Sequence, residues 1–435
     1  MTFAPATVTG APAVREAHEI ELLEGARALF PAMIAAIDAA RIEVALETYI
    51  FDVADSGAEV AEALARAATR GVNVRVVVDG VGTGQLAAPW PDRLERSGVQ
   101  LRVFAPLGWF GWLLPSRWRR LHRKLCVVDG VTAFCGGINI LDDWHDPNWG
   151  QLTAPRLDFA VCVHGELAAD VRRATQQLWQ RIEAMREVRR SDLSAAVRTL
   201  RSEPGDVGAV KAAQISEQRR ASAKESENPS PGEVHPSRFR ANALLLLRDN
   251  FRNRTRIERA YRKAIGEARH DIVIASAYFF PGGKLRRALV HAARRGVRVQ
   301  LLLQGRYEYF LQYHGVQPIY HRLLAAGIEV YEYAPSFLHA KVAVIDADGA
   351  HPWSTVGSSN LDPFSLLLAR EANVVIEAPR FCKALRDRLH VAIAEEGRRI
   401  DPATLASRPW RERWLDRIAF ALMRIALLLA GQQRY

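Results

Sequence analysis

Two segments of the 435-residue sequence repeat the same pattern, and this duplication constrains the fold more than any other feature. The segments run from Arg41 to Gly82 and from His270 to Glu308. Each opens with a short β-branched and aromatic run, which predicts a buried strand. An Ala-, Leu- and Arg-rich helix follows, and an Arg-Gly-Val triplet at Gly71 or Gly296 predicts its glycine C-cap. A second apolar run completes a strand–helix–strand unit in each copy.

The second strand of each unit is predicted at Val74–Val78 and at Val299–Leu303. Strands joined through a helix are expected to lie parallel, with a right-handed crossover. We therefore predict an α/β protein of two similar domains, related by a pseudo-twofold axis within one chain. Sites commonly form where domains meet, so we expect the two halves to share one site at their interface.

Composition marks the boundaries between these domains. The segment Arg201–Arg238 is polar and rich in Ser, Pro and Glu. It has too few large apolar residues to offset the entropy of ordering it, which predicts a mobile linker. The predicted divisions are a tail at 1–21, a first domain at 22–190, the linker at 191–238, a second domain at 239–400 and an amphipathic C-terminal helix at 401–435.

Each domain also carries a second signature, in which a histidine, a lysine and an aspartate recur at fixed spacing. The pattern reads H-x-K, four residues, then D, followed by a small-residue turn that ends in asparagine. The second copy has an insertion after its aspartate, which predicts a longer hairpin. The residues of the two copies are His122, Lys124, Asp129, Gly136, Gly137 and Asn139, and then His339, Lys341, Asp346, Gly357, Ser358, Ser359 and Asn360.

These residue types suit chemistry on a phosphodiester. The flanking apolar runs are strand-like, so H-x-K puts the histidine and the lysine on one face of a strand. A histidine can act as nucleophile or general acid near neutral pH, and a neighbouring lysine supplies a cation for a phosphate oxygen. The small residues let the backbone approach an anion, to which Asn139 and Asn360 can donate. Such a site needs no metal, and the sequence offers no carboxylate-rich cluster to hold one.

Each residue also has a simpler interpretation. A single histidine on a strand is more often structural, and Asp129 begins an Asp-Gly pair that is itself a hairpin-turn signal. Of the 12 histidines, however, only His122 and His339 occur in this pattern, and they lie at equivalent places in the repeat. We therefore predict that the catalytic residues are His122, Lys124, Asp129, His339, Lys341 and Asp346.

The two signatures resemble the paired HKD motifs of the phospholipase D superfamily. The second block, HAKVAVID with GSSNLDPFSLLLAREANVVI, resembles that of bacterial cardiolipin synthases of the B type. The resemblance covers most of Leu22–Ile400 outside the linker. It implies two phospholipase D-like α/β/α sandwich domains with mixed sheets and a shared active site at their interface.

The resemblance further implies a two-step phosphatidyl transfer through a phosphohistidine, with no cofactor. In the family's usual order, His122 is the nucleophile and His339 the general acid and base. Glu371 and Asp158 match the carboxylates that orient the opposite histidine, although each could instead be an ordinary charge at a strand edge. The predicted phosphate-binding and orienting residues are Gly137, Asn139, Ser359, Asn360, Asp158 and Glu371.

The C-terminal segment favours a lipid partner. The formal net charge of +11 suits any anionic partner and does not choose between lipid and nucleic acid. Trp414, Ile418, Leu422 and Ile425 recur at helical spacing beside several arginines, which is typical of a helix at the membrane interface. The alternative is a terminal helix packed on the protein's own surface.

An aromatic segment before the first signature favours the same partner. Trp109, Phe110 and Trp112 lie in a stretch interrupted by Gly and Pro, which predicts a loop leading into the site. Beside a lipid-phosphate site, these side chains would form a lip that dips into the membrane. The alternative is a loop packed over the domain interface.

We therefore predict a peripheral enzyme on the cytoplasmic face of the bacterial inner membrane, with no secretion signal and no membrane-spanning stretch. By resemblance it would be a cardiolipin synthase that releases a small alcohol such as glycerol. The expected partners are an anionic phospholipid membrane, phosphatidylglycerol and, as a further substrate, phosphatidylethanolamine. A phospholipase D that forms phosphatidic acid and a nucleic-acid phosphodiesterase are the alternatives. No nucleic-acid partner is expected, since a nuclease does not account for the apolar C-terminal helix.

Overall fold

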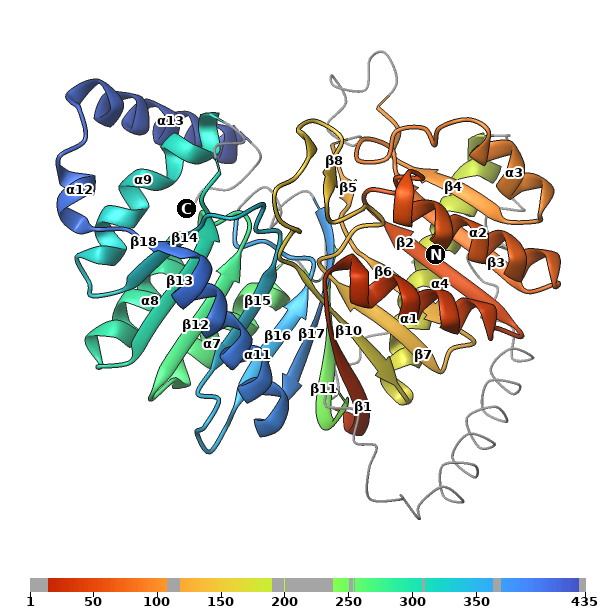
Figure 1. Cartoon of the computed structure of the whole chain (residues 1–435), viewed down its shortest axis with the longest axis horizontal. Coiled ribbons are helices and arrows are strands. Elements are labelled where there is room, and N and C mark those ends of the chain that lie inside the picture. Colours follow the sequence, from red (N-terminus) through yellow and green to blue (C-terminus); the bar gives the residue numbers. More distant parts are fainter. Residues whose placement is uncertain are drawn as a thin grey trace, which may run out of the picture.

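The computed structural model describes residues 15–107, 118–189, 238–249, 255–306, 310–362 and 369–429, together with positions 199 and 253. Figure 1 shows two α/β halves side by side, which meet along the centre of the molecule. The predicted linker lies outside the described residues apart from 199 and Arg238. The first strand begins at Arg15, inside the segment predicted as a tail.

The first half alternates strands and helices before it ends in a long helix. Its elements are β1 (Arg15–Glu24), α1 (Gly25–Asp38), β2 (Glu43–Thr48), α2 (Asp55–Thr69), β3 (Asn73–Asp79), α3 (Trp90–Arg96), β4 (Gln100–Phe104), β5 (Arg120–Leu121), β6 (Leu125–Val128), β7 (Thr132–Gly136), β8 (His145–Asp146), β9 (Gly150–Gln151), β10 (Phe159–His164) and α4 (Glu166–Arg189).

The second half repeats this order and adds a terminal helical extension. Its elements are β11 (Arg238–Arg248), α7 (Arg256–Glu267), β12 (Asp271–Ser276), α8 (Gly283–Arg294), β13 (Arg298–Gln304), α9 (Phe310–Leu324), β14 (Glu329–Tyr333), β15 (Lys341–Ile345), β16 (Trp353–Gly357), β17 (Ala369–Glu377), α11 (Pro379–Val391), a π-helical turn (Ala392–Glu396), β18 (Gly397–Arg399), α12 (Pro402–Ala406) and α13 (Trp410–Leu429).

One mixed sheet runs through both halves. Its order is β18-β14-β13-β12-β15-β16-β17-β11-β1-β10-β7-β6-β2-β3-β4, so the two halves read as the same sequence of strands outward from the central antiparallel β1–β11 pair. This order is the pseudo-twofold expected from the repeat. The predicted α/β fold with mixed sheets is confirmed, and the halves additionally join edge to edge into one sheet.

The strand–helix–strand units form as predicted. β2 pairs parallel with β3 around α2, and β12 pairs parallel with β13 around α8. Gly71 and Gly296 follow the helix ends with φ of 87° and 92°, a left-handed conformation that glycine adopts without a Cβ clash. The insertion in the second signature forms the longer turn between β15 and β16.

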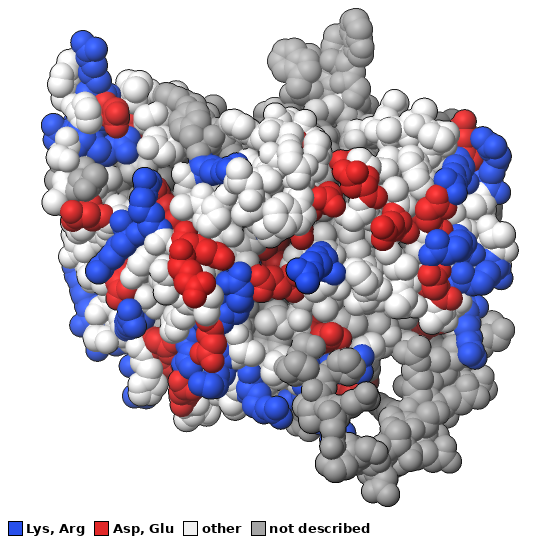
Figure 2. Space-filling model, in the orientation of Figure 1, with Lys and Arg blue, Asp and Glu red and all other residues white. Residues whose placement is uncertain are grey.

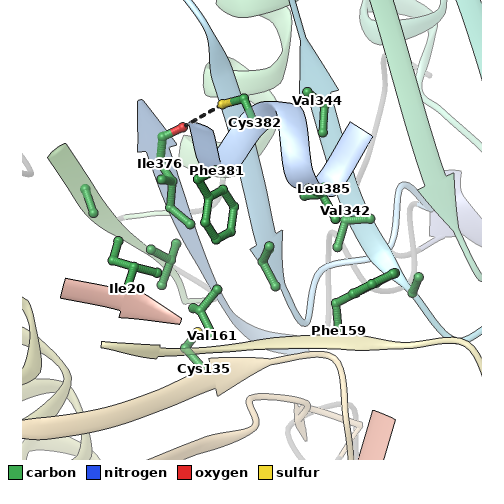
Figure 3. Packing of buried hydrophobic residues seen from close by; sticks show 14 of the residues in the cluster. Ile20, Cys135, Phe159, Val161, Val342, Val344, Ile376, Phe381, Cys382 and Leu385 are labelled. Carbon is green, nitrogen blue, oxygen red and sulfur yellow. Dashed lines mark hydrogen bonds between the residues drawn. The ribbon is translucent and has the colours of Figure 1, made fainter. Parts of the chain in front are cut away.

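A hydrophobic core joins the two halves beneath the site. It combines side chains of β7 and β10 with side chains of β15, β17 and α11. In Figure 3 the rings of Phe159 and Phe381 lie among aliphatic side chains from both halves, including Ile20 and Val342. Because native cores are close-packed, this arrangement fixes the halves relative to each other. The site at their interface is therefore built on a rigid support.

The four cysteines are buried and form no disulfide: Cys126, Cys135, Cys162 and Cys382. Within the described ranges, every helix is too short or too polar to cross a membrane. Figure 2 shows acidic and basic side chains interspersed over the visible face, so the excess positive charge is not gathered into one basic groove there.

Candidate active site

A pocket of about 810 Å³ opens between the two halves. Its lining includes Tyr49, His122 and Asp158 from the first half and Tyr278 and His339 from the second. The two tyrosines occupy equivalent positions in the repeat. The predicted catalytic histidines therefore share one pocket.

Each histidine contacts a carboxylate from the opposite half. Nδ1 of His122 lies 3.0 Å from Oε1 and 3.1 Å from Oε2 of Glu371, which belongs to β17. Nδ1 of His339 lies 2.6 Å from Oδ2 of Asp158, just before β10. Because a carboxylate accepts hydrogen bonds, both contacts favour a proton on Nδ1 and leave the Nε2 lone pair available.

Short strand pairings between the halves hold these contacts in register. Leu157 N–H donates to the Phe337 carbonyl, and His339 N–H donates to the Leu157 carbonyl. On the His122 side, β5 of the first half pairs with β17 of the second, and His122 N–H donates to the Arg370 carbonyl. Both histidines are thus placed by backbone hydrogen bonds to the strand that carries their carboxylate.

The residue behind each carboxylate differs between the two signatures. Ser358 Oγ donates to Oε2 of Glu371 at 2.5 Å. The equivalent position is Gly137, where a Cβ would lie 2.3 Å from Oδ1 of Asp158. The glycine therefore makes room for the Asp158 carboxylate, while the serine helps to fix Glu371.

Both lysines of the signatures are buried beneath the histidines. Lys124 Nζ donates to the His122 carbonyl at 3.0 Å, and Lys341 Nζ donates to the His339 carbonyl. Lys341 Nζ also lies 2.8 Å from Nδ1 of His339 and 3.9 Å from Asp158. Burial, followed by the nearby Lys341 charge, lowers the pKa of Lys124 to about 7. Neither lysine is among the residues that line the pocket, so their charges act on a bound anion from behind the histidines.

The pKa values of the site groups are shifted mainly by burial. Burial lowers the pKa of His122, and the charge of Glu371 partly offsets it. Burial, with Lys341 and Lys124, lowers the pKa of His339 well below its usual value. Burial raises the pKa of Asp158 to about 6 despite the Lys341 charge. Both histidines are therefore neutral at pH 7 in the free enzyme, which a histidine nucleophile requires.

The predicted phosphate-binding residues divide into two groups. Asn139 and Asn360 line the pocket, and Asn139 Oδ1 accepts the Ile50 N–H at 3.3 Å. Gly137 and Ser359 lie outside the lining, and Ser359 N–H donates to Asn373 Oδ1 at 3.3 Å. The two asparagines are thus the members of this set that can reach a bound phosphate.

The two aspartates of the signatures do not line the pocket. Asp129 accepts N–H bonds from residues 41–43 at 2.8–3.0 Å, at the start of β2. Asp346 accepts the equivalent bonds from 269–271 at 2.8–3.1 Å, at the start of β12. Both adopt positive φ angles, 52° and 49°. Each carboxylate holds a hairpin turn against the neighbouring strand, in line with the turn signal at Asp129, and a catalytic role for either aspartate stays a prediction.

Two arginines of the pocket lining were missed by sequence reasoning. Arg120 precedes His122 by two positions, and Arg156 precedes Asp158 by two positions. Since side chains two apart on an extended segment share a face, this spacing was the available signal. Neither arginine belongs to the two signatures.

The predicted membrane contacts are only partly described. Trp109, Phe110 and Trp112 lie outside the described residues. On α13, Trp414, Ile418, Leu422 and Ile425 are 47–58% exposed, whereas Ala419 and Met423 on the opposite side are buried. Figure 1 shows α13 beside α9. The helix therefore packs on the protein through one face and presents an apolar face to solvent.

Comparison with known proteins identifies a family. The family model described as "Cardiolipin synthase, PLD-like domain" matches residues 33–153 and 261–391. Cardiolipin synthase B of Escherichia coli K12 is 35% identical over 417 residues, covering 96% of this chain and 90% of the relative. Cardiolipin synthase of Alkalihalophilus pseudofirmus is 27% identical, covering 92% and 70%. A phosphatidylserine synthase structure from Haemophilus influenzae shares the fold, with a TM-score of 0.61, 14% identity and 94% coverage of both chains.

Proposed function

This chain belongs to the family of cardiolipin synthases with phospholipase D-like domains, and from that premise we propose that it transfers a phosphatidyl group between two phospholipids to form cardiolipin. Phosphatidylglycerol serves as donor and acceptor, and glycerol is released. The observation that carries this proposal is the pair of His–carboxylate contacts that cross between the halves and face one pocket. Two oriented histidines suffice for a displacement through a covalent intermediate.

In the first step, Nε2 of His122 attacks the donor phosphorus. A P–N bond forms, the P–O bond to the glycerol headgroup breaks, and His339 gives a proton to the departing oxygen. The anionic phosphodiester raises the pKa of His339 from its low value in the free enzyme, since an opposite charge nearby favours the imidazolium. Lys124 and Lys341 neutralise the developing charge on the phosphate oxygens.

In the second step, a hydroxyl of the acceptor lipid attacks the phosphohistidine. His339 takes the hydroxyl proton, a P–O bond forms and the P–N bond to His122 breaks, so both histidines return to their starting state. Water attacking the same intermediate would give phosphatidic acid. The balance between synthase and hydrolase therefore depends on how the acceptor is held.

The activity test uses the pure protein with phosphatidylglycerol vesicles and separates the lipid products. The proposal predicts cardiolipin with an equal amount of glycerol, and loss of both in His122→Ala. Phosphatidic acid without cardiolipin would identify a hydrolase, and DNA cleavage without lipid turnover would identify a nuclease. Activity should persist with a chelator, because no step uses a metal.

We also propose that the exposed face of α13 docks on an anionic membrane at the cytoplasmic surface. The apolar residues Ile418 and Leu422 alternate with Arg413 and Arg417 along the helix, which suits the boundary between headgroups and acyl chains. In a vesicle co-sedimentation assay, Ile418→Gln/Leu422→Gln should weaken binding to phosphatidylglycerol vesicles. Met185→Gln, at an exposed apolar residue of α4, is the matched control. Equal binding of both variants would return α13 to a purely structural role.

A further inference from the structure

Each histidine of the pocket has an arginine near it on a short strand pairing. Arg120 lies two positions before His122, and Arg156 lies two positions before the residue that pairs with His339. Next to His339, Leu157 pairs in parallel with Leu338, so Arg156 and Phe337 form one cross-strand pair and Asp158 and His339 form the next on the same face. All four of these side chains line the pocket. Arg156 therefore sits one pleat beyond the site of proton transfer.

Arg156 is held in place by short hydrogen bonds. Nη1 donates to the Asp142 carbonyl at 2.5 Å, and Nη2 donates to Asp146 Oδ2 at 2.6 Å. Its guanidinium lies 6.0 Å from the centre of the Phe337 ring, and Arg306 lies 5.1 Å from the same ring. Two guanidinium groups thus flank one aromatic ring on the His339 side of the pocket.

On the His122 side of the pocket, the equivalent cross-strand pair consists of different residues. Ala369 occupies the position equivalent to Arg156, and Arg120 is its partner. Arg120 donates to buried Asp79 at 3.0 Å and to the carbonyls of Ala105 and Trp118 at 3.1 and 3.2 Å. Its guanidinium donates from Nε, Nη1 and Nη2, whereas that of Arg156 donates from Nη1 and Nη2, so among the described residues the Nε of Arg156 is left for a ligand. The two sides of the pocket are therefore not equivalent toward an anion.

Resting on the proposed function, we propose that Arg156 binds the phosphate that the acceptor already carries, and so selects phosphorylated alcohols over simple ones. In that function, His339 takes the proton of the acceptor hydroxyl. The hydroxyl and the acceptor's own phosphate are separated by a glycerol carbon chain. In the product, a chain of atoms connects the two phosphorus atoms. It contains as many atoms as the backbone segment that connects two Cα atoms two residues apart on a strand. Arg156 lies two positions before Asp158, which pairs with His339, so the spacing along this strand matches the length of the acceptor headgroup.

The role of Arg156 is to bind, and the bond changes occur elsewhere. The acceptor oxygen forms its P–O bond, the P–N bond to His122 breaks, and the hydroxyl proton passes to His339. Meanwhile Arg156 donates charge-assisted N–H bonds to the second phosphate. A water molecule that attacks the intermediate carries no phosphate and cannot make this contact. A phosphate-bearing acceptor gains occupancy near His339, whereas glycerol does not.

The test is a competition between two soluble acceptors that differ only in a phosphate. Deuterated glycerol 3-phosphate and deuterated glycerol are offered together at equal concentration to the enzyme with phosphatidylglycerol vesicles, and the two labelled lipids are counted by mass spectrometry. The wild type should favour glycerol 3-phosphate. Arg156→Gln should lower the product ratio roughly 10- to 100-fold, the range for one charged hydrogen-bond contact. General damage to the protein cancels in this ratio.

Three further variants separate binding from structure. Arg156→Lys keeps the charge and should restore part of the preference. Asp146→Asn breaks the anchoring ion pair but keeps the guanidinium and its bond to the Asp142 carbonyl, so its ratio should fall less than that of Arg156→Gln. Arg120→Gln should likewise keep the ratio whatever its overall rate.

The inference is overturned if Arg156→Gln keeps the wild-type ratio, if Asp146→Asn lowers the ratio equally, or if Arg120→Gln alone lowers it. Cardiolipin without any labelled lipid would also overturn the inference, whereas absence of both cardiolipin and labelled lipid from the wild type would remove the proposed transferase function. The two failures are thus read from different measurements.

Discussion

The two halves supply the same histidine and lysine, but they hold the two histidines differently. Both oxygens of Glu371 face Nδ1 of His122, and Ser358 fixes one of them. Nδ1 of His339 contacts a single oxygen of Asp158, and Nζ of Lys341 also lies close to this Nδ1. The His339 side chain is 23% exposed and the His122 side chain 13%.

This difference suggests how duplicated residues acquire separate roles. A clamped imidazole keeps one direction of attack, which suits His122 as the nucleophile. An imidazole that is more exposed and lies beside a lysine has a pKa that responds strongly to the charge of the substrate, which suits proton transfer by His339. Substitutions at equivalent positions in the two halves are therefore expected to separate the two roles.

The histidines should respond differently to the leaving group. His122→Ala should reduce transfer to background with any donor, because no covalent intermediate forms. His339→Ala should lose about 100- to 10,000-fold with phosphatidylglycerol, the usual range for general acid–base catalysis. A donor with a nitrophenol leaving group, which departs without a proton, should recover much of the first step in His339→Ala alone. Burst measurements of nitrophenol check this, and equal recovery in both variants would remove the distinction.

The carboxylates should differ in their pH dependence. Glu371→Gln and Asp158→Asn should each cost roughly 100-fold or more in kcat, since a misoriented imidazole presents the wrong tautomer. In Asp158→Asn the Lys341 charge is left unbalanced, which lowers the pKa of His339 further. Its deficit should therefore grow as the pH rises, whereas that of Glu371→Gln should not. Parallel pH–rate profiles for the two variants would contradict this account.

The residues behind the carboxylates should also be unequal. Gly137→Ala places a Cβ against Asp158, so its kcat should approach that of Asp158→Asn. Ser358→Ala removes one hydrogen bond to Glu371 and should cost about tenfold. Steady-state kinetics at saturating lipid measures both. A Gly137→Ala enzyme as active as the wild type would show that Asp158 does not need its observed position.

The pH profile of the wild type should be narrow. As the pH falls, His122 gains a proton and loses its nucleophilic lone pair, with a midpoint below the usual 6.5 because burial lowers its pKa. As the pH rises, His339 loses the proton that it must donate, and Lys124 loses its charge near pH 7 in the free enzyme. We expect kcat/KM to be bell-shaped, with the alkaline limb moved to higher pH in Lys124→Arg. An unchanged alkaline limb in that variant would assign it to another group.

One pair of equivalent residues should behave alike. Asp129→Asn and Asp346→Asn each weaken N–H bonds that hold a turn, so each should lower the free energy of unfolding by about 1–3 kcal/mol. Neither should alter the shape of the pH–rate profile, because both carboxylates lie outside the pocket lining. Urea denaturation measures the first effect. A shifted pH profile in either variant would support a catalytic role for that aspartate.

The sequence was sufficient for the features that repeat. The strand–helix–strand units, the pseudo-twofold and the meeting of His122 with His339 follow from local periodicity and from two copies of one signature. The edge-to-edge joining of β1 and β11 was not predictable in this way, because strand pairing between distant segments leaves no local pattern.

The site residues that belong to a motif were predictable from the sequence. The residues whose role depends on tertiary contacts were not. The pairings of Glu371 with His122 and of Asp158 with His339 were anticipated from the family pattern alone. The turn-holding role of Asp129 depends on backbone N–H groups some 86–88 positions earlier. The pocket positions of Arg120 and Arg156 depend on which face of a two-strand pairing points inward. Both depend on tertiary structure, which residue identity alone does not reveal.

The central claim is that His122, and not His339, carries the phosphatidyl group. The most direct test is to mix His339→Ala with labelled phosphatidylglycerol, quench in alkali to preserve phosphohistidine, digest the protein and locate the label by mass spectrometry. The account predicts a phosphatidyl group on His122 and none on any peptide of His122→Ala. A phosphatidyl group on His339, in the wild type or in His122→Ala, would contradict it.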